Sequence, residues 1–261
     1  MKKSIFLVLV YLVIQLFSSS LIKGGFALYQ YLHKGLIVSS MSLAEVIISF
    51  ILSMVLMTLF MAWKGLIPLD RESWTLPTPK PSYLFWLIIA TFSSIFTLDF
   101  LMYYLDFIPD FMEQTFDIIL TSFWGIFTVA LLGPLIEELV FRGAITQFLL
   151  EKYNPRTAIL ISALIFGIVH MNPVQIIGGF LMGLLLGWIY YKTKSILPVF
   201  IVHLINNSLS VILGKQYAGA DTLRDLFSEN FYWSIVAFSI FFLFLSLKQL
   251  NQATTSPFKS K

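Results

Sequence analysis

Long apolar segments follow one another along almost the whole chain, and they limit its fold more than any other feature. Of the 261 residues, 58% are hydrophobic and only 12% are charged, and the mean hydropathy is +0.85. Soluble globular domains contain about 25% charged residues, so this composition lies outside their range. The chain is therefore predicted to be a multi-pass membrane protein with an all-α fold.

Eight apolar stretches are candidates for the roughly 20-residue helix that crosses a bilayer. They leave only short loops, so we predict a single membrane domain over residues 1–261, built as a polytopic bundle of about eight transmembrane helices. One stretch is too long for a simple span and is interrupted by Gly133 and Pro134, where proline should start or kink a helix. The predicted spans are 4–22, 43–63, 83–105, 118–151, 157–171, 174–191, 196–213 and 231–248.

Positive charges predict the orientation of these spans. With both termini in the cytoplasm, all but four of the 17 Lys and Arg residues fall on the inner side, as the positive-inside rule favours. We therefore expect a protein of the cell membrane whose short cytoplasmic tail, 249–261, is disordered from Asn251 onwards. The first segment resembles a signal peptide but lacks a clean cleavage site before Lys23, so it is expected to remain as an anchor. The basic residues left outside are Lys23, Lys34, Lys215 and Arg224.

Composition also narrows the chemistry. The chain has no cysteine, which excludes a disulfide, a thiol nucleophile and a cysteine-based metal site. Its net charge of +3 comes from basic residues that are scattered among apolar segments and form no stripe, so no nucleic-acid partner is expected. Any catalysis must rely on Glu, Asp, His, Ser or Asn side chains.

Glu137 and Glu138 stand next to each other inside the apolar run 131–142. A charged side chain at the bilayer centre costs on the order of 3 kcal/mol on insertion scales, so such residues usually face a protein interior or a wet cavity and serve function. Two later apolar segments each contain a histidine, His170 and His203. These side chains indicate a membrane protein with a polar catalytic centre.

Helical rise places polar residues from three separate segments at similar depths. Counted from the basic residue at the inner end of each segment, Glu137 lies ~22 Å deep, His170 ~21 Å and Asn207 ~20 Å. His203, one turn before Asn207, lies ~14 Å deep by the same rise. We therefore expect an acid, imidazoles and an amide to converge in one site.

Spacing within each segment adds local geometry. Glu138 and Arg142 are four residues apart and can pair on one helix face, whereas Glu137 points about 100° away and can meet another helix. His203 and Asn207 have the same spacing, so both project hydrogen-bond donors toward one place. Another segment carries glycine at every fourth position, which predicts close helix packing. This stripe is Gly179, Gly183 and Gly187.

Three short motifs occur in order: EExxxR at 137–142, FxxxH at 166–170 and HxxxN at 203–207. Each alone is weak, because EExxxR occurs by chance in many soluble helices, but all three within apolar segments are specific. The chain thus resembles the CPBP (Abi) family of CAAX-processing and bacteriocin-processing intramembrane glutamic endopeptidases. The resemblance covers residues 115–213, which we predict to be the catalytic core.

The resemblance implies a bundle of eight helices whose cavity admits water and a peptide. By motif position, Glu137 would be the general base and His170 its partner in activating water. His203 and Asn207 would donate hydrogen bonds to the oxyanion, a role that can be worth ~3 kcal/mol per donor. Structural support would come from Glu138, Arg142 and Phe166.

Three alternatives stay open. Glu137, His170 and His203 would also make an acceptable zinc set, although the HExxH signature is absent and the resemblance implies a reaction without a metal or other cofactor. A different class is a non-catalytic bacteriocin self-immunity or scaffold protein that binds a partner; the intact motifs argue against it. A proton-relay transporter has less support, because the polar residues cluster in the second half and suggest no inverted repeat.

The expected partners are membrane lipids and a hydrophobic peptide substrate. By resemblance, a bacteriocin, a pheromone or a similar exported peptide is favoured over a prenylated protein. The sequence assigns neither the scissile bond nor an oligomeric state.

Overall fold

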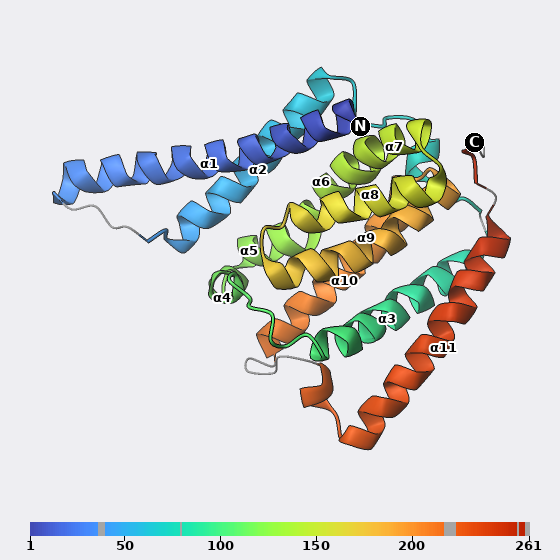
Figure 1. Ribbon diagram of the computed structural model, residues 1–261. Helices are drawn as coiled ribbons and strands as arrows, with labels where there is room; N and C mark the ends of the chain where they lie inside the picture. Colours follow the sequence, from blue (N-terminus) through green and yellow to red (C-terminus); the bar gives the residue numbers. More distant parts are fainter. Residues whose placement is uncertain (36–39, 79, 217–222, 255, 259–261) are drawn as a thin grey trace.

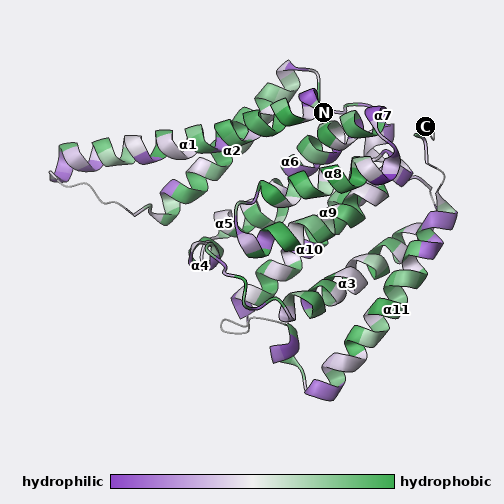
Figure 2. Cartoon of the chain, in the orientation of Figure 1, coloured by the Kyte–Doolittle hydropathy of each residue, from purple (hydrophilic) through white to green (hydrophobic). Residues whose placement is uncertain are grey.

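The computed structural model describes residues 1–35, 40–78, 80–216, 223–254 and 256–258, and within these ranges every regular element is a helix (Figure 1). Hydrophobic residues make up most of each long helix, and hydrophilic ones gather at helix ends and in loops (Figure 2). Among the described residues, seven helices are long and apolar enough to cross a membrane. The predicted all-α, multi-pass membrane fold is therefore confirmed.

Most predicted spans correspond to single helices. The span predicted at 4–22 is longer than expected, because α1 has 33 residues and is therefore about 50 Å long. The span predicted at 157–171 is shorter: α8 (Pro155–Ile168) has 14 residues, about 21 Å, less than the hydrocarbon thickness of a bilayer. The long helices are α1 (Lys2–Lys34), α2 (Leu43–Trp63), α3 (Pro81–Tyr103), α9 (Pro173–Thr193), α10 (Ile196–Gln216) and α11 (Glu229–Ala253).

The overlong apolar stretch predicted at 118–151 folds in two parts. A short helix, α4 (Glu113–Leu120), precedes a continuous helical segment over residues 123–152. The interruption expected at Pro134 is a widened helical turn, and the helix does not break there. Along this segment follow α5 (Phe123–Phe127), the π-helical turn η2 (Thr128–Leu132), α6 (Gly133–Val140), the π-helical turn η3 (Phe141–Thr146) and α7 (Gln147–Lys152).

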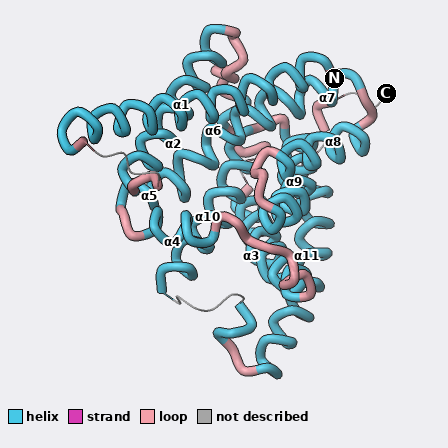
Figure 3. The backbone as a smooth tube through the Cα atoms, turned by 60° about the vertical axis from the view of Figure 1, so that its left-hand side comes forward, coloured by secondary structure: helices cyan, strands magenta, loops and turns pink. Residues whose placement is uncertain are grey.

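Pairs of helices build the bundle. The most extensive contacts join α8 to α9 and α3 to α11, and the latter pair lie side by side in both views (Figure 1, Figure 3). α10 packs on α6 and η2, which brings the third motif against the first. The hairpin of α1 and α2 extends away from the other helices, and it contacts them mainly through α2 on α6 and α1 on η3.

The glycine stripe of α9 faces α8, as predicted. A Cβ atom at Gly183 would lie 3.1 Å from the Cα of Ala163, and one at Gly179 would lie 3.4 Å from the Cα of Gly167. Gly167 itself is more tightly enclosed, because a Cβ there would overlap the main-chain carbonyl oxygen of Ile176. Close backbone packing thus fixes α8, with its FxxxH motif, against α9.

Hydrogen bonds between loops stabilise one end of the bundle. Ser195, between α9 and α10, donates to the carbonyl oxygens of Ser73 (3.1 Å) and Thr75 (2.7 Å) around the short helix η1 (Glu72–Trp74). The Ser73 hydroxyl and amide also bond to Asp70 and hold the pKa of that carboxyl below its usual value. Both chain termini lie near this end (Figure 1), which also gathers several of the basic loops.

The C-terminal tail differs from the expectation of disorder. Residues 251–253 continue α11, the Ser256 hydroxyl donates to the carbonyl oxygen of Tyr191 at 2.9 Å, and Phe258 stacks on the Tyr191 ring. Aromatic packing therefore orders part of the segment that its polar composition suggested would be free. Residues 255 and 259–261 of the predicted tail lie outside the described residues.

We predict that Gly167→Ala lowers the free energy of unfolding by about 1–3 kcal/mol, because the added methyl group overlaps the α9 backbone. Gly178→Ala is the matched control: a Cβ at Gly178 meets nothing within 4 Å, and alanine favours a helix by up to about 1 kcal/mol over glycine. Denaturant unfolding in detergent micelles measures both. Equal stability of the two variants would contradict the packing described for α8 and α9.

Candidate active site

A buried ion pair lies at the centre of the site. The Nη1 of Arg142 and the Oε1 of Glu138 lie 3.0 Å apart, and neither side chain is exposed. The same Oε1 accepts a hydrogen bond from Nδ1 of His203 on α10, at 2.6 Å. The guanidinium also lies over the ring of Phe166 on α8, 4.3 Å from its centroid. This cluster therefore connects side chains of all three sequence motifs.

His203 also faces the other glutamate. Its Nε2 lies 3.8 Å from Oε2 of Glu137, so the imidazole stands between two carboxylates. An ionised carboxylate only accepts hydrogen bonds, so Nδ1 of His203 carries a proton toward Glu138, and Nε2 donates only when the ring holds its second proton. The side chain of Glu137 is 22% exposed. The adjacent glutamates thus differ: one is a buried anchor and the other an accessible carboxylate.

His170 lies in the turn just after α8. Its Nδ1 lies 2.8 Å from the carbonyl oxygen of Phe166, a contact that requires a proton on Nδ1 and leaves Nε2 of the neutral ring as an acceptor. The Phe166 ring packs edge-on against His170, with centroids 5.2 Å apart, and against His203 at 5.8 Å. Phe166 is therefore the packing link between the two imidazoles.

Asn207 pairs with a backbone carbonyl of the helix that carries the glutamates. Its Nδ2 donates to the carbonyl oxygen of Val129 at 3.1 Å. Within η2 the amide of Gly133 bonds to Thr128, one residue further back than in an α-helix. In that register the partner of Val129 would be residue 134, and proline has no N–H. The Asn207 side chain thus supplies the hydrogen bond that Pro134 cannot make.

Two π-helical turns flank the glutamates, η2 before α6 and η3 after it. Such turns are rare and occur often at functional sites. Pro134 was a sequence signal for the first, because a wider turn accommodates a residue without an amide hydrogen. No residue pattern in the sequence indicated the second π-helical turn, which begins at Phe141 and includes Arg142.

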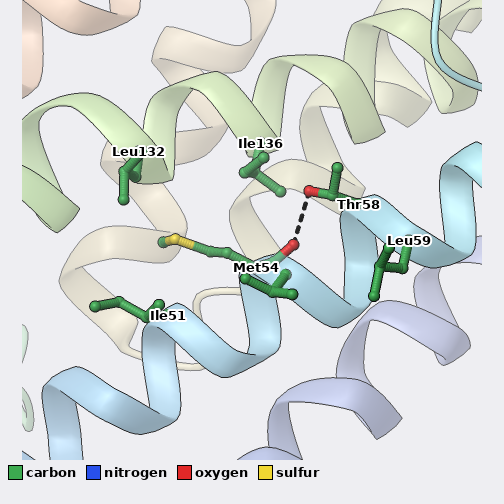
Figure 4. Close-up of a pocket in the computed structure, with 7 residues that line it drawn as sticks. Ile51, Met54, Thr58, Leu59, Leu132 and Ile136 are labelled. Carbon is green, nitrogen blue, oxygen red and sulfur yellow. Dashed lines mark hydrogen bonds between the residues drawn. The ribbon is translucent and has the colours of Figure 1, made fainter.

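An apolar cleft of about 270 Å³ opens between α2 and the segment of η2 and α6 (Figure 4). A Cβ placed on Gly133 would lie 3.7 Å from Cε of Met54 and 3.9 Å from Oε1 of Glu137, so the cleft wall and the carboxylate are neighbours. The sequence did not suggest a role for α2, because its contribution is apolar and carries no motif. The cleft is lined by Ile51, Met54, Val55, Thr58, Leu59, Leu132 and Ile136.

The residues proposed for a zinc set do not come together as one. Glu137 and His203 are neighbours, but they form no metal-binding group with His170. In the part of the chain that the structure describes, no group of three His, Cys, Asp or Glu side chains could hold a metal ion. We therefore assign no reaction step to a metal.

Comparison with known proteins agrees with the motifs and this geometry. The family model for Rce1-like type II CAAX prenyl endopeptidases matches residues 119–209, the stretch that holds all the residues of the three motifs. Residues 119–209 are thus similar to a CAAX endopeptidase domain, in agreement with the CPBP resemblance of the motifs. This region lies inside the core predicted at 115–213.

A curated relative shows the same local similarity. Over 85 residues, or 32% of its length, this chain is 40% identical to the Bacillus subtilis (strain 168) protein named "Putative membrane peptidase YdiL". The match spans 34% of that relative, about a third of its length. No solved structure matches significantly.

Removal of the anchor glutamate should be costly. In Glu138→Ala the Arg142 guanidinium stays buried without its counter-charge, so we expect the free energy of unfolding to fall by about 3–5 kcal/mol. Glu229→Gln is the control, because its partner Arg224 and Glu229 itself are partly exposed and such pairs contribute about 0–1 kcal/mol. Unfolding of both variants in detergent tests this; similar losses would contradict the central role of the buried pair.

The link between Asn207 and Pro134 predicts a specific coupling. Asn207→Ala leaves the Val129 carbonyl unpaired and should cost about 1–3 kcal/mol. Pro134→Ala restores a main-chain N–H, so the same asparagine substitution should cost at least about 0.5 kcal/mol less in that background. A double-mutant cycle on unfolding in micelles measures the difference, and an unchanged cost would show that Asn207 does not substitute for the missing proline amide.

Proposed function

We propose that this chain is an intramembrane endopeptidase that hydrolyses a peptide bond with water activated by Glu137 and His170. The observation that carries the proposal is the accessible carboxylate of Glu137 beside the imidazole of His203 and near an apolar cleft, in a membrane domain similar to CAAX endopeptidases. A peptidase needs these features together: a base, an oxyanion donor and a place for the substrate chain.

The reaction begins with a water molecule near Glu137. The carboxylate takes a proton from this water as its oxygen attacks the peptide carbonyl carbon, and the Nε2 of His170 accepts a hydrogen bond that orients the water. The proton then passes to the leaving amine as the C–N bond breaks. Glu138 is not available as the base, because its Oε1 is engaged by Arg142 and His203.

The oxyanion is stabilised from α10. His203 donates from Nε2 in its doubly protonated form, while Glu138 holds the other side of the ring. Asn207 has two hydrogens on Nδ2, one of which is directed to Val129, and the second is available to the substrate. Donors held in this way need no reorganisation during the reaction, which is the condition for effective stabilisation of a tetrahedral intermediate.

A hydrophobic peptide is the substrate class that fits the cleft between α2 and α6. Its lining is apolar, so it favours apolar side chains over charged ones. We propose an exported or membrane-associated peptide, such as a bacteriocin or pheromone. We also propose that the protein lies in the cell membrane with both termini and the basic loops on the cytoplasmic side, as the positive-inside rule favours.

We expect Glu137→Gln to lower the rate of peptide cleavage by at least about 10²–10⁴-fold, the contribution of a positioned general base, without loss of folding. Purified variants in detergent are incubated with a library of hydrophobic leader peptides, with and without EDTA, and products are read by mass spectrometry. Glu72→Gln, at an exposed position at the start of η1, is the matched control and should cleave like the unsubstituted chain.

The same variant separates catalysis from partner binding. If Glu137→Gln protein, present at normal membrane levels, still confers immunity to a bacteriocin in cells, the biological role is binding and the peptidase proposal fails for that role. Cleavage that EDTA abolishes and zinc restores would instead assign a metal to the reaction.

A further inference from the structure

The side chain of Asn172 forms an unexpected tie between two loops. It is fully buried at the N-cap of α9, where an asparagine ordinarily accepts a hydrogen bond from its own helix, but no such bond is formed. Instead its Oδ1 accepts from the amide of Phe111 at 3.0 Å and its Nδ2 donates to Oδ1 of Asp110 at 2.8 Å. The same Asp110 oxygen also accepts from the amide of Met112.

This tie lies two residues after His170. Between them, Met171 has a φ of +53°, in the left-handed region that residues other than glycine seldom occupy and that persists only where the surroundings enforce it. The Met171 side chain is 63% exposed, so its own packing does little to hold the turn. The backbone bonds of His170 and Met171 reach back to α8, so the side-chain bonds of Asn172 are the contacts that join this turn to the loop at 110–112.

The other side of the His170 ring is already constrained. Nδ1 is bonded to Phe166, and the ring lies against α9, because a Cβ on Gly179 would lie 3.5 Å from the ring atoms Cε1 and Nδ1, at van der Waals contact. The direction of Nε2 thus depends on where the turn after α8 places the backbone. A shift of that turn moves Nε2 toward or away from the site.

We propose that Asp110 and Asn172 are positioning residues for His170, acting through the turn at 169–172. They hold Nε2 of His170 in the direction needed to orient the attacking water. The catalytic part of this inference rests on the proposed peptidase function, whereas the geometric part does not. Asp110 lies in the loop that follows α3, outside the region that the family model matches. This positioning role is therefore not part of the matched domain.

Two substitutions and their combination test the tie. Asn172→Asp places two carboxylates against each other and removes the donor. The exchange Asp110→Asn with Asn172→Asp restores it: residue 110 then donates to residue 172, while the amides of Phe111 and Met112 keep carboxyl or amide oxygens as acceptors. The exchange should therefore recover what the single substitution loses.

The position of His170 can be followed without any assay of activity. The chain has three histidines, so protein labelled with ¹³C at the histidine Cε1 gives three NMR signals in micelles, assigned with His33→Gln, His170→Gln and His203→Gln. In Asn172→Ala and Asn172→Asp the His170 signal should move or broaden, and in the double exchange it should return. The His33 signal should stay in place throughout.

Asn154→Ala is the matched control. Asn154 caps the other end of the same helix, α8, by accepting from the amide of Thr157, so its loss weakens the helix by a comparable single bond. A merely structural effect would move His170 in this variant as well. We expect the unfolding temperature to fall but the His170 signal to remain where it is.

Activity supplies the second readout. If the unsubstituted chain cleaves a peptide of the leader library, Asn172→Ala should lower kcat by about ten- to a hundredfold with KM little changed, as for a misplaced catalytic group, and the double exchange should recover it. An unchanged His170 signal in Asn172→Asp, or a folded double exchange with a displaced signal, would overturn the proposal. A displaced and restored signal in a chain that cleaves nothing would support positioning and count against the peptidase function alone.

Discussion

The contact between Glu138 and Arg142 is the constraint on which the rest of the site depends. Both groups are fully buried within a membrane protein, where an unpaired charge is strongly disfavoured. Partners from other helices meet part of this requirement: His203 of α10 bonds to the carboxylate and Phe166 of α8 covers the guanidinium. The fully buried charges therefore determine which helices must meet, and the groups proposed for catalysis are placed as a consequence.

A second constraint comes from Pro134. Its missing amide hydrogen would leave a carbonyl group unpaired in an apolar environment, and the chain responds with a π-helical turn and a bond from Asn207. Irregular backbone within a membrane domain is tolerated only where protein groups satisfy it. The same bond ties α10 to the segment before α6, so the glutamates and His203 are held in register by two contacts of different chemistry.

Much of this arrangement could be predicted from the sequence. The segment at 43–63 is predominantly apolar and matches α2 at both ends. The ion pair of Glu138 and Arg142 follows from their spacing, because residues four apart on a helix always share a face. Counting helical rise predicted that polar groups of three segments converge, but it placed His203 at ~14 Å and Glu137 at ~22 Å, so the contacts of His203 with both glutamates were not foreseen.

Other features had no local signal. The second π-helical turn, the bond between Asn207 and Val129, and the tie between Asn172 and Asp110 each depend on contacts between distant segments. The length of α1 was underestimated, because the residues after 22 mix polar and apolar side chains and the end of the span was judged by hydropathy alone. The packing of Phe258 could not be foreseen either, since a polar tail gives no indication of a single aromatic contact.

The two adjacent glutamates show how one helix can hold a buried structural carboxylate next to an accessible carboxylate. Neighbouring residues on a helix point about 100° apart, so one carboxylate can be enclosed by Arg142 and His203 while the other, Glu137, remains accessible beside the α2–α6 cleft. A general base must be reached by water and by substrate, whereas an anchor must exclude both. Because His203 contacts both carboxylates, any shift of the buried anchor also moves the donor that faces the accessible base. The side chain of His203 therefore links the stability of the bundle to the geometry of the proposed reaction.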